Sequence, residues 1–489
     1  MSVSLTWAEW SPNAFARANA ENKPILLSLV TAWSDECAAM DQTTYSQRAV
    51  ESLIEERFVP VRVDADRRPD INERYNLGGW PTTAFLTSAG DLLSGGTYFD
   101  APHMRTALQQ VADAYRDRAD EIRARALMVG RVRSAAVRHA EVRSAGLQAS
   151  QDPIPHFRSL LIDRFDPVHA GFGSQPKHPH PYALLVALSL AGEGDRELEE
   201  IVSVTLDRMT DLWDLNRGGF YRYADGRDWS TPNAGKTLEE NAALLHVYVE
   251  AALQLRDGRW RARAADIVRW VKGAMIDSAG GGFFNAASSR AVDTTMYVDR
   301  NAMMVGAFIR AAALFDDIWL RDFALKSLEA VIVPAYKPGE GVAHFTSSAG
   351  GRPAGGLLTD QIHVAGALIW AHAATGQLPY SMLAAEVAQF AMRAMWDESA
   401  GGFRDRADLA DPVVPFELNC HAAVVLDRLG VLTGDTSYQD RALAILRSLA
   451  ADFRAHDLLG APYALAAREI LDRRPPAGLE LTPVDWQLG

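Results

Sequence analysis

Gly218-Gly219-Phe220 is the clearest copy of a turn that recurs along most of the chain. Related copies occur at Gly171-Phe172, Gly281-Gly282-Phe283, His344-Phe345 and Gly401-Gly402-Phe403. The copies are separated by roughly 50 to 65 residues, which is the size of a two-helix repeat. Glycine adopts the left-handed conformations that end a helix, and the following Phe can anchor the turn in the core. The spacing therefore predicts a series of helical hairpins.

Each predicted hairpin begins with an apolar helix and continues with an amphipathic one. The apolar helices open on a polar pair such as Glu240-Asn241 or Asp360-Gln361, and their apolar residues then run nearly all round the helix. The pairs are expected at 181–191 with 195–213, 238–255 with 259–276, 301–315 with 320–333, 361–375 with 380–395 and 418–432 with 438–453, flanked by helices at 155–165 and 462–472. Helices that are apolar all round are buried, so an inner ring inside an outer ring satisfies both kinds. We expect an (α/α)6 toroid, with an open solenoid as the alternative.

The amino-terminal part has a different pattern. Residues 23–30 and 58–64 are short apolar runs that predict buried strands, and residues 34–56 between them have helical spacing. A strand, helix and strand in this order predict a parallel βαβ unit, and residues 78–86 predict a third strand. The fold class is therefore an α/β domain followed by an all-α domain. We expect the first domain at 1–118, a helical linker at 119–150 and the toroid at 151–489.

Composition limits the possible partners and location. The chain has 489 residues, a formal net charge of −13 and two cysteines, Cys37 and Cys420. The acidic balance argues against a nucleic-acid or anionic-membrane surface, and no apolar run is long enough to span a bilayer. The lack of a signal peptide and the few cysteines predict a cytoplasmic protein without a disulfide framework or a cysteine-based zinc site. We expect no metal and no cofactor; the oligomeric state stays open.

The amino-terminal part resembles the thioredoxin-like domain of the spermatogenesis-associated protein family, whose members carry a glycosidase-like carboxyl-terminal part. The resemblance rests on Glu21 to Leu27, Trp33 to Met40, Val63 to Asp70, Gly79-Trp80-Pro81 and Gly95 to Phe99. It implies a thioredoxin-like fold with a cis peptide bond before Pro81. In the toroid, Gly171 to Pro179 and Gly218 to Tyr223 resemble two further phrases of the same family. The His and Glu that the family has before Lys236 are replaced by Asn233-Ala234-Gly235.

The turn that carries the redox site in that family is degenerate here. It reads Ser34-Asp35-Glu36-Cys37, where the family usually has Cys-x-x-Cys. Dithiol exchange needs a nucleophilic thiolate at the first position, which Ser34 cannot supply. The acidic neighbours are expected to raise the pKa of Cys37. We therefore expect no dithiol oxidoreductase activity.

The turns and the starts of the inner helices are expected to gather polar side chains at one end of the ring. Carboxylates, amides and aromatic rings in a concave pocket are typical of sugar sites. The candidate catalytic carboxylates are Glu240, Asp299, Asp360 and Glu417, from which the sequence selects no pair. The candidate substrate-binding residues are Lys177, His178, Arg222, Tyr223, Asp225, Trp229, Lys236, Asn241 and Asn301.

The sequence leaves two functions open. The first is a protein that binds or processes a small carbohydrate in the toroid, as a hydrolase with two carboxyl groups or an epimerase with paired histidines. The second is a non-catalytic interaction or regulatory protein in which both ancestral sites have decayed. Polar residues at helix starts also serve as N-caps, which stabilise a helix by about 0.5 to 2 kcal/mol without any chemistry. His246 and His363 lie within apolar runs and are interpreted as core histidines.

Overall fold

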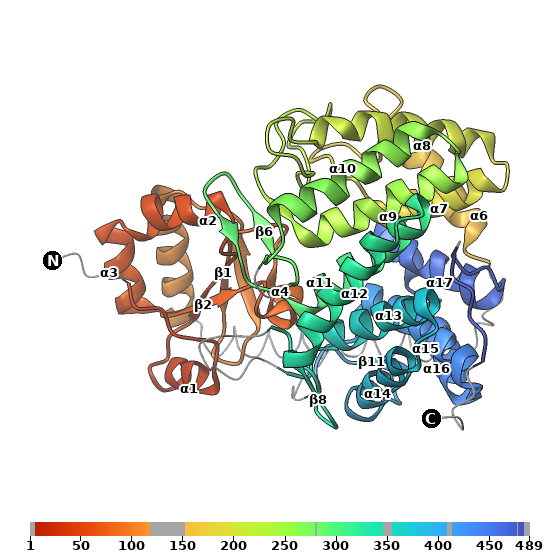
Figure 1. Cartoon of the computed structure of the whole chain (residues 1–489). Coiled ribbons are helices and arrows are strands. Elements are labelled where there is room, and N and C mark those ends of the chain that lie inside the picture. Colours follow the sequence, from red (N-terminus) through yellow and green to blue (C-terminus); the bar gives the residue numbers. More distant parts are fainter. Residues whose placement is uncertain are drawn as a thin grey trace. The chain divides into compact units, whose positions relative to one another are not determined.

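The structure is a computed structural model that describes residues 5–117, 152–278, 281–345, 355–407, 413–476 and 478–483. The chain divides into two compact units, one formed by residues 1–139 with 288–291 and the other by residues 140–287 with 292–489 (Figure 1). The predicted linker at 119–150 lies outside the described residues and stays a prediction. Among the helices of the described ranges, none combines the length and the apolar character needed to cross a membrane.

The amino-terminal unit contains a four-stranded sheet. Its strands are β1 (Ile25–Val30), β2 (Val59–Asp64), β3 (Thr82–Leu86) and β4 (Leu92–Gly96), in the order β2-β1-β3-β4. Strand β1 pairs with β2 in parallel and with β3 in antiparallel orientation, which confirms the predicted βαβ unit and the mixed thioredoxin-like sheet. The peptide bond between Trp80 and Pro81 is cis, as the resemblance implies.

Helices cover both faces of this sheet, which explains its continuous apolar strands. Leu26 packs on one face with residues of α3 (Arg48–Arg57) and of the helical stretch 101–117, while Leu27 packs on the other face with residues of α1 (Pro12–Ala20) and α4 (Pro69–Tyr75). A strand buried on both sides reads as an unbroken apolar run. The single helix predicted at 34–56 is interrupted: α2 (Asp35–Met40) passes through a π-helical turn (Asp41–Tyr45) before α3 begins.

The carboxyl-terminal unit is a closed ring of six inner helices. These are α7 (Pro181–Gly192), α9 (Leu238–Gln254), α11 (Val298–Phe315), α13 (Leu358–Thr375), α15 (Phe416–Thr433) and α17 (Ala461–Leu471). Each inner helix packs on the next, and the last one packs on the first, so the ring closes (Figure 1). The predicted toroid is confirmed, and the open solenoid is excluded.

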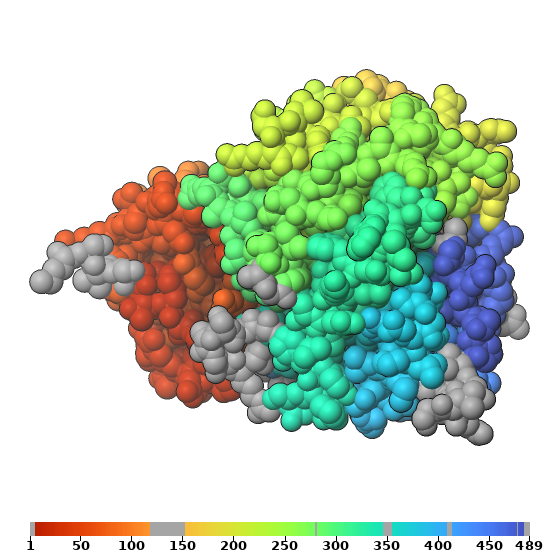
Figure 2. All heavy atoms as spheres, viewed as in Figure 1, coloured from red at the N-terminus to blue at the C-terminus, as the bar shows by residue number. Residues whose placement is uncertain are grey.

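A second layer of helices surrounds the inner ring. It consists of α6 (Ile154–Arg164), α8 (Arg196–Arg208), α10 (Gly258–Ala274), α12 (Ile318–Ala335), α14 (Leu378–Ala394) and α16 (Thr436–Leu449), with η2 (Met209–Leu212) and η3 (Phe453–Gly460) as 3-10 segments. Figure 2 shows α10 and α12 at the molecular surface. Asp195, Asp257, Asp317 and Asp435 each accept a backbone N–H hydrogen bond at the start of an outer helix. This repeated N-cap fixes where the second helix of a hairpin begins.

The recurring turns form short antiparallel pairings at one end of the ring. Phe220 pairs with Trp213, and the other turns follow the same scheme: Phe165 with Phe172, Ile276 with Phe283, β8 (Tyr336–Lys337) with β9 (Gly341–Val342), and β10 (Trp396–Asp397) with β11 (Gly402–Phe403). The fourth copy is therefore Gly341-Val342, and its assignment to His344-Phe345 was wrong. Gly341 supplies the positive φ of the turn, and Val342 occupies the position of the Phe. The strands β5 (Lys236–Thr237), β6 (Ala286–Ala287) and β7 (Val292–Asp293) form a further small sheet.

Candidate functional site

Four amide side chains at the starts of the inner helices hold the recurring turns. The side chain of Asn241 accepts a hydrogen bond from Phe220 N (2.9 Å) and donates to Phe220 O (3.0 Å) and Thr237 O (2.9 Å). Asn301, Gln361 and Asn419 make the same three bonds to their own turns. All four are buried and their hydrogen-bonding groups are occupied. Asn241 and Asn301, predicted to bind substrate, therefore act within the fold.

Two lysines hold the first two turns in a similar way. Lys177 Nζ donates to Asp166 Oδ2 (3.0 Å) and Gly173 O (3.0 Å), and Lys236 Nζ donates to Asp214 Oδ2 (2.8 Å) and Gly218 O (2.8 Å). Both lysines are buried. Burial acts to raise the pKa of Asp214, but hydrogen bonds from Lys236, Tyr221 and the backbone hold it well below its usual range. Lys177 and Lys236, also predicted to bind substrate, are thus internal ion-pair partners.

Trp229 and Asp225 belong to one loop but differ in exposure. The Trp229 side chain is 1% exposed, and its Nε1 donates to His169 O (3.0 Å), so its ring packs in the core and cannot serve as a platform for a sugar. The Asp225 side chain is exposed in the loop that carries Trp229.

Four of the predicted residues do come together. Arg222 Nε donates to Glu240 Oε1 (3.2 Å), and the rings of His178 and Tyr223 lie 4.9 Å apart. Burial lowers the pKa of His178, and the charge of Arg222 lowers it further while that of Glu240 opposes this. The Thr237 hydroxyl donates to the Glu240 carboxylate, and its oxygen accepts from Glu240 N, so Thr237 caps α9. The carboxylate of the predicted catalytic residue Glu240 is therefore engaged by Thr237 and Arg222.

A second group of polar side chains faces the axis of the ring. Along the otherwise buried helices α9 and α13, positions three or four residues apart stay partly accessible, as at Ala243 and His246 or at His363 and Gly366. The ring of Tyr182 on α7 lies 5.2 Å from that of His421 on α15, although α17 separates these helices in the ring. Helices that are not neighbours can meet only across the axis. These side chains therefore point into the centre of the ring.

We call this group the axial cluster; it comprises Tyr182, Glu239, His246, Arg300, His363, Glu417 and His421. The Arg300 guanidinium lies 3.5 Å from Glu239 Oε2 and 5.0 Å from the Tyr297 ring, and the rings of His363 and His421 are 5.5 Å apart. Glu417, a predicted catalytic residue, is close enough to the Tyr182 hydroxyl to help raise the pKa of Tyr182, for which burial is the main cause.

The axial cluster contains a carboxyl group with a strongly altered affinity for protons. Enclosure by the ring raises the pKa of Glu239 to about 7, with the nearby acidic residues adding to the effect and Arg300 opposing it. Water still reaches 52% of this side chain, so its loss of hydration is partial. Burial lowers the pKa of His363 and lowers that of His421 to about 3, so both imidazoles are neutral at pH 7. Glu239 is thus a group that can give and accept a proton near neutral pH, in one cluster with two neutral imidazoles.

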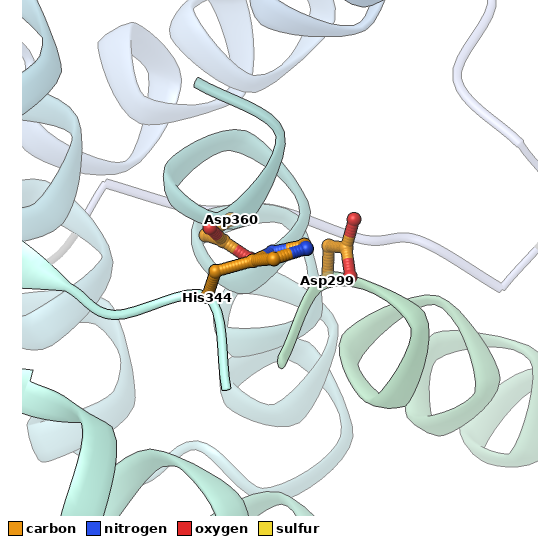
Figure 3. Close-up of side chains that lie close together, drawn as sticks. All are labelled: Asp299, His344 and Asp360. Atoms are coloured by element: carbon orange, nitrogen blue, oxygen red, sulfur yellow. The ribbon is translucent and has the colours of Figure 1, made fainter. Parts of the chain in front are cut away.

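The two remaining predicted carboxylates, Asp299 and Asp360, lie on either side of His344 (Figure 3). His344 Nδ1 is 2.8 Å from Asp360 Oδ1, and Thr359 Oγ1 donates to Asp299 Oδ2 (3.0 Å). Burial raises the pKa of Asp360 to about 6 against the lowering effects of His344 and of the Asp299 backbone. Burial also tends to raise the pKa of Asp299, but the charges of His344 and Arg300 outweigh it and bring this pKa below its usual value.

In the degenerate turn of the amino-terminal unit, Ser34 is a helix cap and the Cys37 thiol is buried. Ser34 Oγ accepts a hydrogen bond from Cys37 N (3.1 Å) and so caps α2, while the Cys37 side chain is 4% exposed. Burial is the main cause that raises the pKa of Cys37, with smaller contributions from Asp41 and Glu36. A buried thiol with a raised pKa is a weak nucleophile. Ser34 and Cys37 thus have structural roles here, and the third residue of the predicted redox turn, Pro81, has the expected cis peptide bond.

Most contributors to the site were not selected from the sequence as catalytic or substrate-binding candidates, and within the axial cluster Glu417 is the one that was. Glu239 precedes two residues with structural roles, and only the phase of α9 turns it toward the axis. His363 was interpreted as a core histidine, although its side chain is partly accessible. His344 was assigned to a copy of the recurring turn and not to a site. A polar residue one or two positions before the repeated Asn or Gln, such as Asp360 or Glu239, is the signal that could have marked the start of the inner helix.

Comparisons with known proteins agree with this architecture. Residues 2–132 match the family model Thioredox_DsbH, described as a protein of unknown function, DUF255. Spermatogenesis-associated protein 20 of Rattus norvegicus is 28% identical over 308 residues, covering 58% of this chain and 38% of that protein, and the Homo sapiens protein gives the same values. The chain therefore spans well under half the length of these relatives.

Solved structures resemble the helical unit in fold. A D-mannose isomerase has a TM-score of 0.56 and 13% identity, covering 67% of this chain and 99% of that chain. A GH76 α-mannanase from Bacteroides thetaiotaomicron has a TM-score of 0.54 and 10% identity, covering 68% and 99%. At such identities the likeness concerns the fold alone. The chain thus resembles the spermatogenesis-associated 20 proteins, with an amino-terminal part that matches a thioredoxin-like family model and a helical ring that shares its fold with a sugar isomerase and a mannanase.

Proposed function

We propose that the helical ring binds and processes a small carbohydrate at its axial cluster. The observation that carries this proposal is the convergence of Glu239, Arg300, Glu417 and two histidines across the ring axis. Such a cluster offers hydrogen-bond donors and acceptors for sugar hydroxyls, and Tyr182 offers an aromatic ring for the apolar sugar face. The structural neighbours that act on sugars, an isomerase and a mannanase among them, support the same class of ligand.

Glu239 is the proposed proton donor. Its pKa of about 7 keeps much of it protonated at neutral pH, as an acid that protonates a leaving oxygen requires. Glu417 is the carboxylate that would oppose it in a hydrolase. His363 and His421 favour a second reaction, proton transfer at a sugar carbon. A neutral imidazole can take the proton from the carbon, and the imidazolium that forms can return a proton to it; the two rings lie 5.5 Å apart.

The thioredoxin-like unit is proposed to lack dithiol chemistry, because Ser34 stands at the position of the attacking thiol. We further propose a cytoplasmic location without nucleic-acid or membrane partners. The free thiols of Cys37 and Cys420 and the net charge of −13 support this proposal.

Thermal stability in the presence of mono- and disaccharides tests the carbohydrate proposal. A bound sugar should raise the melting temperature of the wild-type chain, and Glu239→Gln should remove this rise. Glu199→Gln, which alters a surface ion pair on α8, is the matched control and should keep it. If no sugar raises the melting temperature, the carbohydrate proposal fails and the non-catalytic interaction protein replaces it.

Product analysis then distinguishes the two reactions. A hydrolase releases new reducing ends, and Glu239→Gln should slow their release. A carbon-directed proton transfer instead incorporates solvent deuterium into the sugar, and His363→Ala or His421→Ala should abolish incorporation. A sugar that binds with neither outcome would reduce the proposal to binding.

A further inference from the structure

Asp299, His344 and Asp360 form a compact group of potential metal ligands. One candidate ligand atom from each residue lies within 4.8 Å of the other two (Figure 3). The residues come from the start of α11, the segment after β9 and the start of α13, and they are 8%, 1% and 0% exposed. Metal-to-ligand bonds of about 2.0 to 2.2 Å place ligand atoms roughly 3 to 4 Å apart. The side chains need to contract only by about 1 Å to surround an ion.

An unsatisfied oxygen points to a missing ligand at this place. Asp360 Oδ1 contacts His344, whereas Oδ2 of the same carboxylate is buried and makes no hydrogen bond of normal geometry to the described residues. A buried carboxylate oxygen without a partner is costly, because its hydration is lost without replacement. A bound cation would satisfy this oxygen and reduce the repulsion between the two carboxylates.

Neighbouring groups already orient the ligands. Asp299 Oδ1 accepts from Arg300 N (2.8 Å), Asp299 Oδ2 accepts from the Thr359 hydroxyl (3.0 Å), and the Tyr297 ring packs 5.1 Å from the His344 ring. Hydrogen bonds from such surrounding groups hold ligand side chains in place and tune a metal site. The site is thus partly organised before an ion arrives.

We propose that Asp299, His344 and Asp360 bind one divalent cation. One imidazole nitrogen and two carboxylates suit Zn²⁺, Mn²⁺ or Fe²⁺ better than Ca²⁺ or Mg²⁺, which favour oxygen ligands alone. Three protein ligands leave positions open for water or another oxygen donor. Asp299 and Asp360 adjoin Arg300 and Thr359, whose side chains are partly accessible, so the ion would lie beside the axial cluster. The proposal does not rest on carbohydrate binding.

Calorimetric titration of the chelator-treated full chain with ZnCl2 and MnCl2, without sugar, tests the site. We expect about one ion per chain, and a rise in melting temperature of roughly 5 °C at a hundredfold excess over Kd. Asp360→Asn and His344→Gln should weaken binding by at least about 100-fold. Asp397→Asn, which removes the carboxylate at the end of β10, should leave metal binding unchanged.

Wild-type measurements keep the proposal falsifiable if a variant fails to fold. Pulsed electron paramagnetic resonance of bound Mn²⁺ should detect a coordinated histidine nitrogen, and a shell of oxygens alone would overturn the assignment. Failure of the wild type to bind either ion would also overturn it, as would undiminished binding by folded Asp360→Asn and His344→Gln. The trio would then be a proton-sharing cluster. Neither metal binding nor its absence changes the result expected from the thermal-stability test with sugars.

Discussion

Glu239, Glu240 and Asn241 are consecutive polar residues, yet α9 gives them three different environments. Asn241 is buried against the turn at Phe220, Glu240 pairs with Arg222, and Glu239 faces the axis with half of its side chain accessible. The turn region and the axial cluster are thus built from the same residue types at neighbouring positions. Hydrogen-bonding groups are occupied by the fold in the first region and remain accessible in the second. Helix phase, rather than residue type, separates structure from candidate chemistry.

Breaking a buried ion pair of the turn region should have the largest effect. Lys236→Met leaves the Asp214 carboxylate buried with fewer partners, which should reduce the free energy of unfolding by about 3 to 5 kcal/mol. Urea denaturation measures the loss, and Lys337→Met on the exposed strand β8 is the control. A loss below about 1 kcal/mol would contradict the structural role of Lys236.

The loss of stability caused by Lys236→Met should also depend on pH. The folded-state pKa of Asp214 lies below its unfolded value, so its stabilising contribution is present above about pH 4 and is lost as the pH falls. Without Lys236 the folded-state pKa rises. The deficit of Lys236→Met should therefore be largest near neutral pH and shrink below pH 4.

The buried amide side chains that hold the recurring turns, which we call the amide clamp, should have the next largest effect on stability. Asn241→Ala removes three hydrogen bonds and leaves the buried backbone groups of Phe220 without partners, so we expect a loss of about 2 to 4 kcal/mol. Asn216→Ala, in the same turn but exposed, should change the free energy of unfolding by less than about 0.5 kcal/mol. Equal losses in the two variants would show that the clamp has no special role.

The repeat architecture could be predicted from the sequence because it rests on periodicity. Turns that need glycine and helices that are apolar all round leave a regular pattern, and the closed ring and the cis bond before Pro81 were both confirmed. The roles of single polar residues could not be predicted in the same way. Lys177, Lys236 and Trp229 carry groups typical of sugar sites, but the fold buries each of them. Asp299 and Asp360 were candidates from the sequence, but they and His344 come from three separate elements, so the local sequence does not indicate that the three meet.

A change in the axial cluster should have little effect on stability and a measurable effect on its pH dependence. The folded-state pKa of Glu239 is raised from 4.5 to about 7, so folding favours its protonated form. Its contribution to stability is fully present below about pH 4.5 and is lost as the pH rises to about 7. The decline in the free energy of unfolding should be less than about 1 kcal/mol, because water reaches half of the side chain. Glu239→Gln should remove this decline. Parallel melting-temperature profiles of wild type and variant from pH 4 to 8 would contradict the raised pKa.

The degenerate turn extends the comparison to the amino-terminal unit, where the smallest effect is expected. Cys37 is a candidate chemical group by its position in a thioredoxin-like fold, but burial raises its pKa and Ser34 caps the helix in place of an attacking thiol. We expect the native chain to react with a thiol reagent only as fast as it unfolds, since Cys420 is buried as well. Insulin reduction should stay at the free-thiol background in the wild type and in Cys37→Ala. Rapid labelling that persists in Cys420→Ala and disappears in Cys37→Ala would place Cys37 among the accessible groups, and the turn would then be a reactive site.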